Sequence, residues 1–522
     1  MNNTFTSLSE AVKAFSDRYE MFSLPSISSQ DEALLSTCDF VSLLNRKIET
    51  ADTRSDVQQL EGYKIQAVRW LKDWMAAHPE DRQRLSDIVQ GRVDEGFPWD
   101  VVRPPSTALA MLYNFSPFQD TGATVASKRL RDFTRSFDVI ACSFLNKKKI
   151  DSTIEAIAEP YVNSKYFLPL NPSWASWEAF QAFVAHSNRA ANSLLADGRK
   201  YDFVYSRAMW APSIYAGAWF KMKHPEIAWV AEFSDPLSLD VEGLSRGGEI
   251  PRDAFSATLM QEIQSSFADV MPEDLNIFSL AEYLVYALAD EIIFTNDNQR
   301  ATMLEHVVDP RARARIEEVS SVSNHPTLPR NYYLREDSNY EVDDDALNLG
   351  YFGEFYSSRG ITEVTAAIRS LPETIQRRVR LHVFTNYIPA FDGARRPRNF
   401  SQAQFDDLVN RALEGVGATG IEHLVRLNAS LPYLTFLATT EKLDYLIVND
   451  ARSGEHHTVN PYLPSKWSDY AGSSAETWAF VETGSILSTK PATVKTPVGD
   501  VSRAREDLWT MVVRKFPELE DR

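Results

Sequence analysis

The stretch LNLGYFGEFYSSRGITEVTAAI, residues 347–368, reads as a buried strand, a short polar turn and a helix in direct succession. Its apolar start does not alternate with polar residues, which is typical of a parallel strand covered on both faces. Gly353 follows this strand, and Arg359 with Gly360 precedes the helix. A close-approach glycine, a fixed cation and a helix N-terminus at one point are the parts that bind a diphosphate. The alternative is that Arg359 is an ordinary solvated side chain.

The same pattern continues towards the C-terminus. Helix candidates separate four further apolar runs: VRLHVFTN (379–386), HLVRLNAS (423–430), LDYLIVND (443–450) and TWAFVETG (477–484). Apolar runs that alternate with amphipathic helices predict a doubly wound parallel sheet. We therefore predict an α/β domain over residues 336–490 and a terminal helical segment over residues 491–522.

A second unit of the same style precedes the opening stretch. Its apolar runs are ALAMLYNF (108–115), FDVIACSF (137–144), YDFVYSRA (201–208), IAWVAEFS (227–234) and DEIIFTN (290–296). These runs predict another α/β domain over residues 101–335. The polar, acidic segment 330–346 has little to bury and is predicted to be a linker. Residues 1–100 are predicted to form a helical extension because Leu60, Tyr63, Ala67, Leu71 and Trp74 recur at helical spacing.

Composition excludes several classes of protein. The chain has 522 residues and a net charge of −18, which argues against binding to nucleic acid. Two cysteines, no signal-like start and no long apolar run predict a cytoplasmic protein without a membrane span. The basic spot at Lys147, Lys148 and Lys149 leaves peripheral membrane association open. No dinucleotide, P-loop or metal-binding motif is present, so no bound cofactor and no metal are expected.

Polar residues follow the strands of the first domain. Asp120 and Gly122 stand between the first strand and a helix, Arg207 ends a later strand, and Asp235 follows the next one. In doubly wound folds, ligands bind at the carboxyl ends of the strands, so these residues are site candidates. A loop glycine at Gly122 and a simple turn at Asp235-Pro236 are the alternatives.

The segment NPYLPSKWSDYAGSS, residues 460–474, is the last of these strand-to-helix connections. Ser465 is predicted to cap the helix, with Asp469 one turn later. Lys466 at a helix start is disfavoured by the helix dipole, and a bound phosphate would offset this.

Five segments together resemble the GT-B glycosyltransferases, most closely the retaining family 4-like group. They are DTGATVASKRL, VAEFSDP, LADEIIFTNDNQRATML, GYFGEFYSSRGITEVTAAI and NPYLPSKWSDYAGSS, the last being similar to the group's PSKxxEY form of the nucleotide-sugar motif, written PSKxxDY here. The resemblance covers roughly residues 105–490. It implies two Rossmann-like domains that face a cleft and a metal-independent transfer of a sugar to an acceptor hydroxyl, with retention.

The resemblance also implies roles for individual residues. The donor would be a nucleotide sugar, UDP- or GDP-linked, and the acceptor a glycan, a lipid-linked molecule or a small molecule in glycan or polysaccharide biosynthesis. Asp469 would bind the ribose, and Arg359, Lys466 and Asp120 would serve catalysis. The implied donor-side residues are Gly353, Arg359, Ser465, Lys466, Asp469 and Tyr470, and the implied acceptor-side residues are Gly122, Arg207 and Asp235.

Two other functions stay open at this point. The run YAGSSAETW replaces the Gly-Arg/Lys-Pro run that the group usually has after this helix, which leaves room for a catalytically silent GT-B partner subunit. A nucleotide-sugar epimerase of the same fold would require a carboxylate-rich cleft that also contains histidine.

Overall fold

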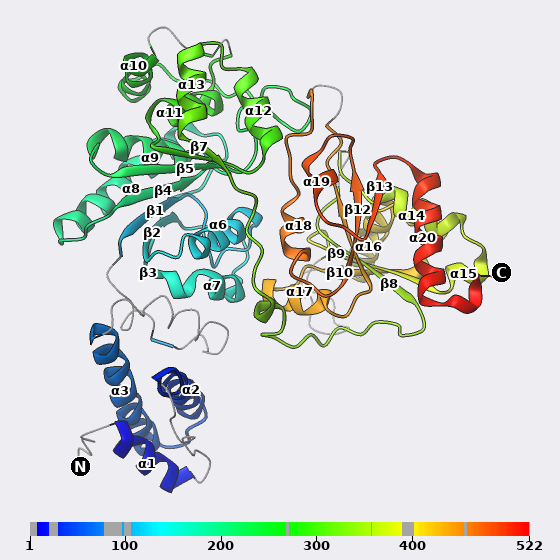
Figure 1. Cartoon of the computed structure of the whole chain (residues 1–522), viewed down its shortest axis with the longest axis horizontal. Helices are drawn as coiled ribbons and strands as arrows, with labels where there is room; N and C mark the ends of the chain where they lie inside the picture. Colours follow the sequence, from blue (N-terminus) through cyan, green and yellow to red (C-terminus); the bar gives the residue numbers. More distant parts are fainter. Residues whose placement is uncertain are drawn as a thin grey trace.

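The computed structural model describes residues 8–19, 30–77, 97–98, 106–267, 271–272, 274–355, 358–388, 401–453 and 457–520. Two parallel sheets form two α/β units, and a group of helices precedes them in the chain (Figure 1). We call them the N-terminal unit (residues 106–322) and the C-terminal unit (residues 347–519). The predicted fold class is confirmed: two doubly wound α/β units with an N-terminal helical extension.

The N-terminal helices pack on one another around a core of their own. They are α1 (Leu8–Tyr19), α2 (Gln30–Glu49) and α3 (Arg54–Ala77). Leu60, Tyr63, Ala67 and Leu71 are all buried on the inner face of α3, as their spacing predicts. The predicted end of this extension at residue 100 lies outside the described residues.

The N-terminal unit contains a seven-stranded parallel sheet in the order β3-β2-β1-β4-β5-β6-β7. Its strands are β1 (Ala108–Leu112), β2 (Phe137–Cys142), β3 (Val162–Leu168), β4 (Phe203–Arg207), β5 (Ala228–Phe233), β6 (Glu291–Phe294) and β7 (Ser320–Val322). Its helices are α6 (Thr121–Asp132), α7 (Ser152–Ala158), α8 (Trp177–Ala196), α9 (Ala211–Lys223), α10 (Ala254–Phe267), α11 (Ile277–Leu288), α12 (Asp297–Glu305) and α13 (Pro310–Val319). The central strands β1, β2 and β4 are buried almost throughout, which explains their unbroken apolar runs.

The C-terminal unit contains a six-stranded parallel sheet in the order β10-β9-β8-β11-β12-β13. Its strands are β8 (Leu347–Phe352), β9 (Val379–Thr385), β10 (Val425–Ala429), β11 (Tyr445–Asn449), β12 (Glu476–Val481) and β13 (Val494–Pro497). Its helices are α14 (Thr362–Ser370), α15 (Glu373–Gln376), α16 (Gln402–Gly415), α17 (Tyr433–Thr440), α18 (Ser465–Tyr470), α19 (Ile486–Thr489) and α20 (Val501–Lys515). The second sheet thus extends past the predicted boundary at residue 490, because β13 is its edge strand.

The connection between the two units differs from the sequence prediction in one respect. Tyr332 and Tyr333, which belong to the segment interpreted as having little to bury, are 0% and 1% exposed. The Tyr332 hydroxyl donates to the carbonyl oxygen of Ala156 at 3.4 Å, and the Tyr333 hydroxyl donates to the carbonyl oxygen of Asp469. The segment is predicted to bury little because most of its residues are polar. Two of its tyrosines are nevertheless buried, one in contact with each unit.

Hydrogen bonds join the two units on both sides of the space between them. On one side, the backbone N–H groups of Tyr433 and Leu434 donate to the side chains of Asp151 and Thr153, at 2.8 and 3.1 Å. On the other side, Asn296 donates to the carbonyl oxygen of Pro461 at 2.9 Å. These contacts help to hold the two units in their relative placement.

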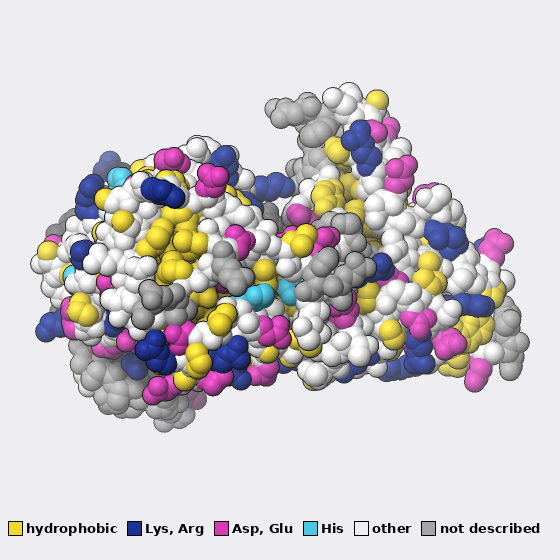
Figure 2. All heavy atoms as spheres, turned by 90° about the horizontal axis from the view of Figure 1, so that it is seen from above, with side chains coloured by type: hydrophobic (Ala, Val, Ile, Leu, Met, Phe, Trp, Pro, Cys, Tyr) yellow, Lys and Arg dark blue, Asp and Glu magenta, His cyan; other side chains and the backbone are white. Residues whose placement is uncertain are grey.

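The face of the molecule seen in Figure 2 carries acidic and basic side chains that are interspersed over both lobes. Among the described helices, none is both long and apolar enough to cross a membrane.

Candidate functional site

A cavity of about 620 Å³ lies between the two units, where the carboxyl ends of strands from both sheets meet. The structure brings all ten sequence-predicted site residues to the wall of this one cavity. They are Asp120, Gly122, Arg207 and Asp235 from the N-terminal unit and Gly353, Arg359, Ser465, Lys466, Asp469 and Tyr470 from the C-terminal unit. Their individual roles toward a ligand stay predictions.

The first connection, between β1 and α6, is built around Asp120. This residue is the N-cap of α6, and its carboxylate accepts a hydrogen bond from the backbone N–H of Gly122 at 2.8 Å. Its other oxygen lies 3.0 Å from Nζ of Lys148, which also lines the cavity. A Cβ added to Gly122 would lie 2.3 Å from Sδ of Met209, so any larger residue there would require the Met209 side chain to shift.

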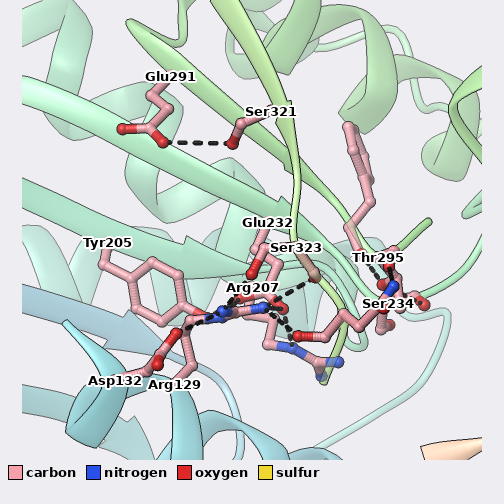
Figure 3. A network of polar contacts seen from close by, with 12 residues as sticks. Arg129, Asp132, Tyr205, Arg207, Glu232, Ser234, Glu291, Thr295, Ser321 and Ser323 are labelled. Carbon is pink, nitrogen blue, oxygen red and sulfur yellow. Dashed lines mark hydrogen bonds and ion pairs between the residues drawn. The ribbon is translucent and has the colours of Figure 1, made fainter. Parts of the chain in front are cut away.

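A buried network of charges lies behind the N-terminal wall of the cavity. Figure 3 shows Arg129, Arg207 and Glu232 pointing toward one another from α6, β4 and β5. Nε of Arg129 lies 3.0 Å from Oε2 of Glu232, and Nε of Arg207 lies 3.3 Å from Oε1. Burial raises the pKa of Glu232, but the two guanidinium groups outweigh it and lower the pKa to about 2. The network therefore fixes Arg207 at the cavity wall.

Asp235 stands beyond the end of β5 and is half-buried at the wall of the cavity. Burial raises the pKa of its carboxyl group, against the opposing effect of Arg207, Arg246 and Arg359. Within the described part of the chain, this carboxyl group takes part in no hydrogen bond or ion pair. It is available to accept a hydrogen bond from a ligand.

His325 is a cavity residue that the sequence analysis missed. It follows β7, is 6% exposed and lines the cavity, and its Nδ1 atom has no hydrogen-bond partner among the described residues. Burial, followed by the charge of Arg207, lowers its pKa to about 3, so the imidazole is neutral. His325 stands just past the end of β7, and that position is the one signal that could have identified it. The sequence did not reveal β7, because this strand is only three residues long.

The opening connection of the C-terminal unit places Gly353 and Arg359 on the opposite wall. A Cβ at Gly353 would meet no atom closer than 3.6 Å, so packing leaves room for a side chain, but the backbone φ of +158° is one that other residues rarely adopt. Arg359 is half-buried, and its Nε has no partner among the described residues. The side-chain amide of Asn449 donates to the carbonyl oxygen of Gly360 at 2.7 Å, which ties this loop to the end of β11.

Helix α18 carries the remaining predicted residues. The prediction that Ser465 caps this helix is wrong, because the N-cap is Pro464 and no side chain caps the helix. Lys466 is stabilised at the helix start by the protein itself: its Nζ lies 4.2 Å from the centre of the Phe436 ring and 3.3 Å from Oδ2 of Asp469. Tyr470 packs beside Phe436, with ring centres 6.4 Å apart.

Asp469 is a cavity carboxylate that is paired with two lysines. Its Oδ1 lies 2.5 Å from Nζ of Lys128 and accepts a hydrogen bond from the Tyr433 hydroxyl at 2.7 Å. Burial raises the pKa of Asp469, but Lys128 and Lys466 outweigh it and hold the pKa below its usual value. The carboxylate is therefore ionised, and only 6% of its side chain is exposed.

No group of three or more His, Cys, Asp or Glu side chains that could hold a metal ion occurs within the described ranges. The cavity wall nevertheless combines cations and carboxylates from both units. Besides the residues already discussed, the charged side chains at the wall are Asp151, Arg246 and Glu354.

Comparison with known proteins gives similarity in structure only. No family model and no curated protein sequence matches the chain. A sucrose-phosphate synthase from Thermosynechococcus elongatus is 11% identical, with a TM-score of 0.47, over 78% of this chain and 90% of that chain. The catalytic domain of starch synthase IV from Arabidopsis thaliana is 10% identical, with a TM-score of 0.47, over 80% of this chain and 94% of that chain. A UDP-GlcNAc 2-epimerase from Neisseria meningitidis is 11% identical, with a TM-score of 0.41, over 79% of this chain and 92% of that chain.

Proposed function

We propose that the protein is a glycosyltransferase that moves a sugar from a nucleoside-diphosphate sugar to an acceptor hydroxyl group. One observation carries the proposal. On one side, the cavity between the two doubly wound units is lined by Lys466 and by Arg359, whose Nε has no partner among the described residues. On the other side it is lined by Asp235, whose carboxyl group has no partner within the same described part of the chain. Ligands of doubly wound sheets bind at the carboxyl ends of the strands, which is where this cavity lies.

The C-terminal wall suits a nucleoside diphosphate. As the bond between the sugar and the diphosphate breaks, the departing phosphate takes the electron pair and gains negative charge. Arg359 and Lys466 line this wall and supply positive charge in a partly dehydrated space. Asp469 accepts from ribose hydroxyl groups through its cavity-side oxygen.

The N-terminal wall suits a polyhydroxylated acceptor. Asp120, Arg207 and Asp235 line it, and His325 adds a neutral imidazole with an unpartnered nitrogen. We assign retention to the reaction: the acceptor oxygen bonds to the anomeric carbon from the face that the phosphate leaves, and the departing phosphate takes the acceptor proton. No resident cofactor and no metal is assigned to this step.

The decisive experiment is incubation with a panel of UDP-, GDP-, ADP- and TDP-sugars, with nucleoside diphosphate release as the readout. Slow release without an acceptor, and faster release with a glycan or sugar acceptor, is the expected result. A protein that binds no nucleotide by calorimetry would contradict the transferase and would leave a partner-subunit role. Within the proposal, the donor is UDP- or GDP-linked, the acceptor belongs to glycan or polysaccharide biosynthesis, and the protein acts in the cytoplasm.

A nucleotide-sugar epimerase is the second candidate, and one observation favours it. Its requirement for a carboxylate-rich, histidine-bearing cleft is met by the lining, because His325 shares the cavity with Asp120, Asp151, Asp235 and Asp469. The two candidates differ in their products. An epimerase inverts one carbon of the sugar while the nucleotide stays attached, so NMR of the nucleotide sugar after incubation separates it from a transferase.

A further inference from the structure

One buried ion pair at the cavity crosses between the two units. Lys128 belongs to α6 of the N-terminal unit, and Asp469 belongs to α18 of the C-terminal unit. Lys128 is 1% exposed, and its Nζ lies 2.5 Å from Oδ1 of Asp469 and 3.2 Å from the hydroxyl oxygen of Ser468. Lys128 does not line the cavity, whereas Asp469 does, so the lysine stands behind the carboxylate.

The two oxygens of Asp469 have different surroundings. Oδ1 is saturated at the back by Lys128 and by the hydroxyl group of Tyr433, at 2.5 and 2.7 Å. Among the described residues, Oδ2 has a single partner, Nζ of Lys466 at 3.3 Å, and Lys466 itself lines the cavity. An ionised carboxylate accepts about four hydrogen bonds, so Oδ2 retains capacity for a ligand hydroxyl group.

We propose that Lys128 is a positioning residue for the nucleotide: from the N-terminal unit, it holds Asp469 ionised and turned so that Oδ2 faces the cavity. The nucleotide site is then completed only when both units are in place, although its ligand-contacting carboxylate comes from one of them. This inference rests on the proposed function for the identity of the ligand, but not for the state of the carboxylate.

The surroundings of Asp469 make this dependence testable by pH. The titratable or charged groups that face Asp469 are Lys128, Lys466, Tyr333, Tyr433 and Tyr470, and His325 lies close to Lys128. Burial raises the pKa values of the three tyrosines, so they stay neutral between pH 5 and 8, as does His325. In the absence of Lys128, only Lys466 and the Tyr433 hydroxyl group oppose the effect of burial on Asp469. The pKa of Asp469 is therefore expected to rise.

The experiment measures binding of UDP and GDP by calorimetry between pH 5 and 8 in four proteins: wild type, Lys128→Met, Asp469→Asn and the double variant. The terminal phosphate of UDP and GDP titrates at about pH 6, so each affinity is compared with that of wild type at the same pH. Relative to wild type, we expect the affinity of Lys128→Met to fall about ten-fold from pH 8 to pH 5. Asp469→Asn weakens binding by the same factor at every pH, and the double variant matches Asp469→Asn. A Lys128→Met protein with the pH profile and affinity of wild type would overturn the inference.

Unfolding experiments test the same residue pair without any nucleotide. Compared with the double variant, Lys128→Met is expected to lose stability as the pH rises from 4 to 8, because a buried carboxyl group with a raised pKa holds its proton longer when folded. Parallel stability curves for these two proteins would overturn the inference. If wild type binds no nucleotide, the proposed function fails, whereas this second experiment still decides the role of Lys128. If Lys128→Met fails to fold but the double variant with Asp469→Asn folds, that outcome also supports the inference, because the unpaired buried carboxylate is then the cause of the failure.

Lys221→Met is the matched control. Lys221 also lies in the N-terminal unit and forms an ion pair with a carboxylate, at 2.8 Å from Asp290, but it does not line the cavity or contact Asp469. Its removal deletes one lysine and one ion pair without changing the pH profile of nucleotide binding. A pH slope in this control equal to that of Lys128→Met would show that the slope comes from general loss of charge.

Discussion

Arg207 and Glu232, on the neighbouring strands β4 and β5, face each other with Nε and Oε1 3.3 Å apart in the interior of the protein. The Tyr205 hydroxyl group donates to the other oxygen of Glu232 at 2.5 Å, so the carboxylate is enclosed by donors. A cavity residue is thus held in place by a group that never reaches the cavity.

Glu232→Gln is expected to destabilise the protein by about 3–5 kcal/mol at pH 7, because it leaves Arg129 and Arg207 buried without their carboxylate. The pKa of Glu232 is lowered from 4.5 to about 2 by folding. Its contribution, about 3 kcal/mol, is therefore complete above pH 4.5 and is lost as the pH falls toward 2. Urea unfolding of both proteins at several pH values checks this. Equal stability at pH 7 would contradict the prediction.

Arg359→Ala is expected to weaken binding of a nucleoside diphosphate ten- to a hundred-fold while changing the free energy of unfolding by less than about 1 kcal/mol. The reason is that Arg359 is half-buried and its Nε has no partner among the described residues. Calorimetry and urea unfolding measure the two quantities. Arg377→Ala, which removes an exposed arginine paired with Glu373, is the control for general loss of charge. Unchanged affinity in Arg359→Ala would remove this residue from the site.

His325→Phe is expected to keep or raise stability, by up to about 1 kcal/mol, because it removes a buried nitrogen that lacks a partner. The same change is expected to lower turnover, since a ligand hydroxyl group then loses its hydrogen bond. Because its pKa is lowered to about 3, His325 contributes no step near pH 6.5 to the pH profile of wild type. Thermal unfolding and a donor-turnover assay separate these outcomes. A stable variant with full turnover would assign His325 to packing alone.

Asp450→Asn is expected to stabilise the protein at pH 7. Burial raises the pKa of Asp450 from 3.8 to about 6, and its Oδ1 has no partner among the described residues. The folded protein then holds a proton that the unfolded chain releases, so stability falls as the pH rises from 3.8 to 6. Removing this effect is worth up to about 3 kcal/mol. Urea unfolding at pH 4 and pH 7 tests it, and a variant no more stable than wild type at pH 7 would contradict it.

The central strands of both sheets were predictable because they are covered on both faces and leave unbroken apolar runs. The strands that the sequence did not reveal, β3, β7 and β13, all lie at sheet edges. Strand β3 has a mixed burial pattern, and β7 is three residues long, so neither produces a recognisable run. Edge strands bury fewer of their side chains, so fewer of their positions need an apolar residue.

The sequence identified those cavity residues that directly follow a strand recognisable from its apolar run. His325 was missed because it follows β7, and Tyr332 and Tyr333 were missed because acidic neighbours dominate their segment. The partnership of Lys128 with Asp469 joins residues 341 positions apart, and no local pattern encodes it. Such pairs depend on how two independently wound sheets are placed against each other.

The ion pair between Lys128 and Asp469 also limits how such a protein can be recombined. The two units look like exchangeable modules, since each has its own sheet and core. A chimera that joins one unit to a homologous half without the matching partner would bury a lone charge at the boundary. When units are exchanged between homologous proteins, Lys128 and Asp469 therefore have to be kept or replaced together.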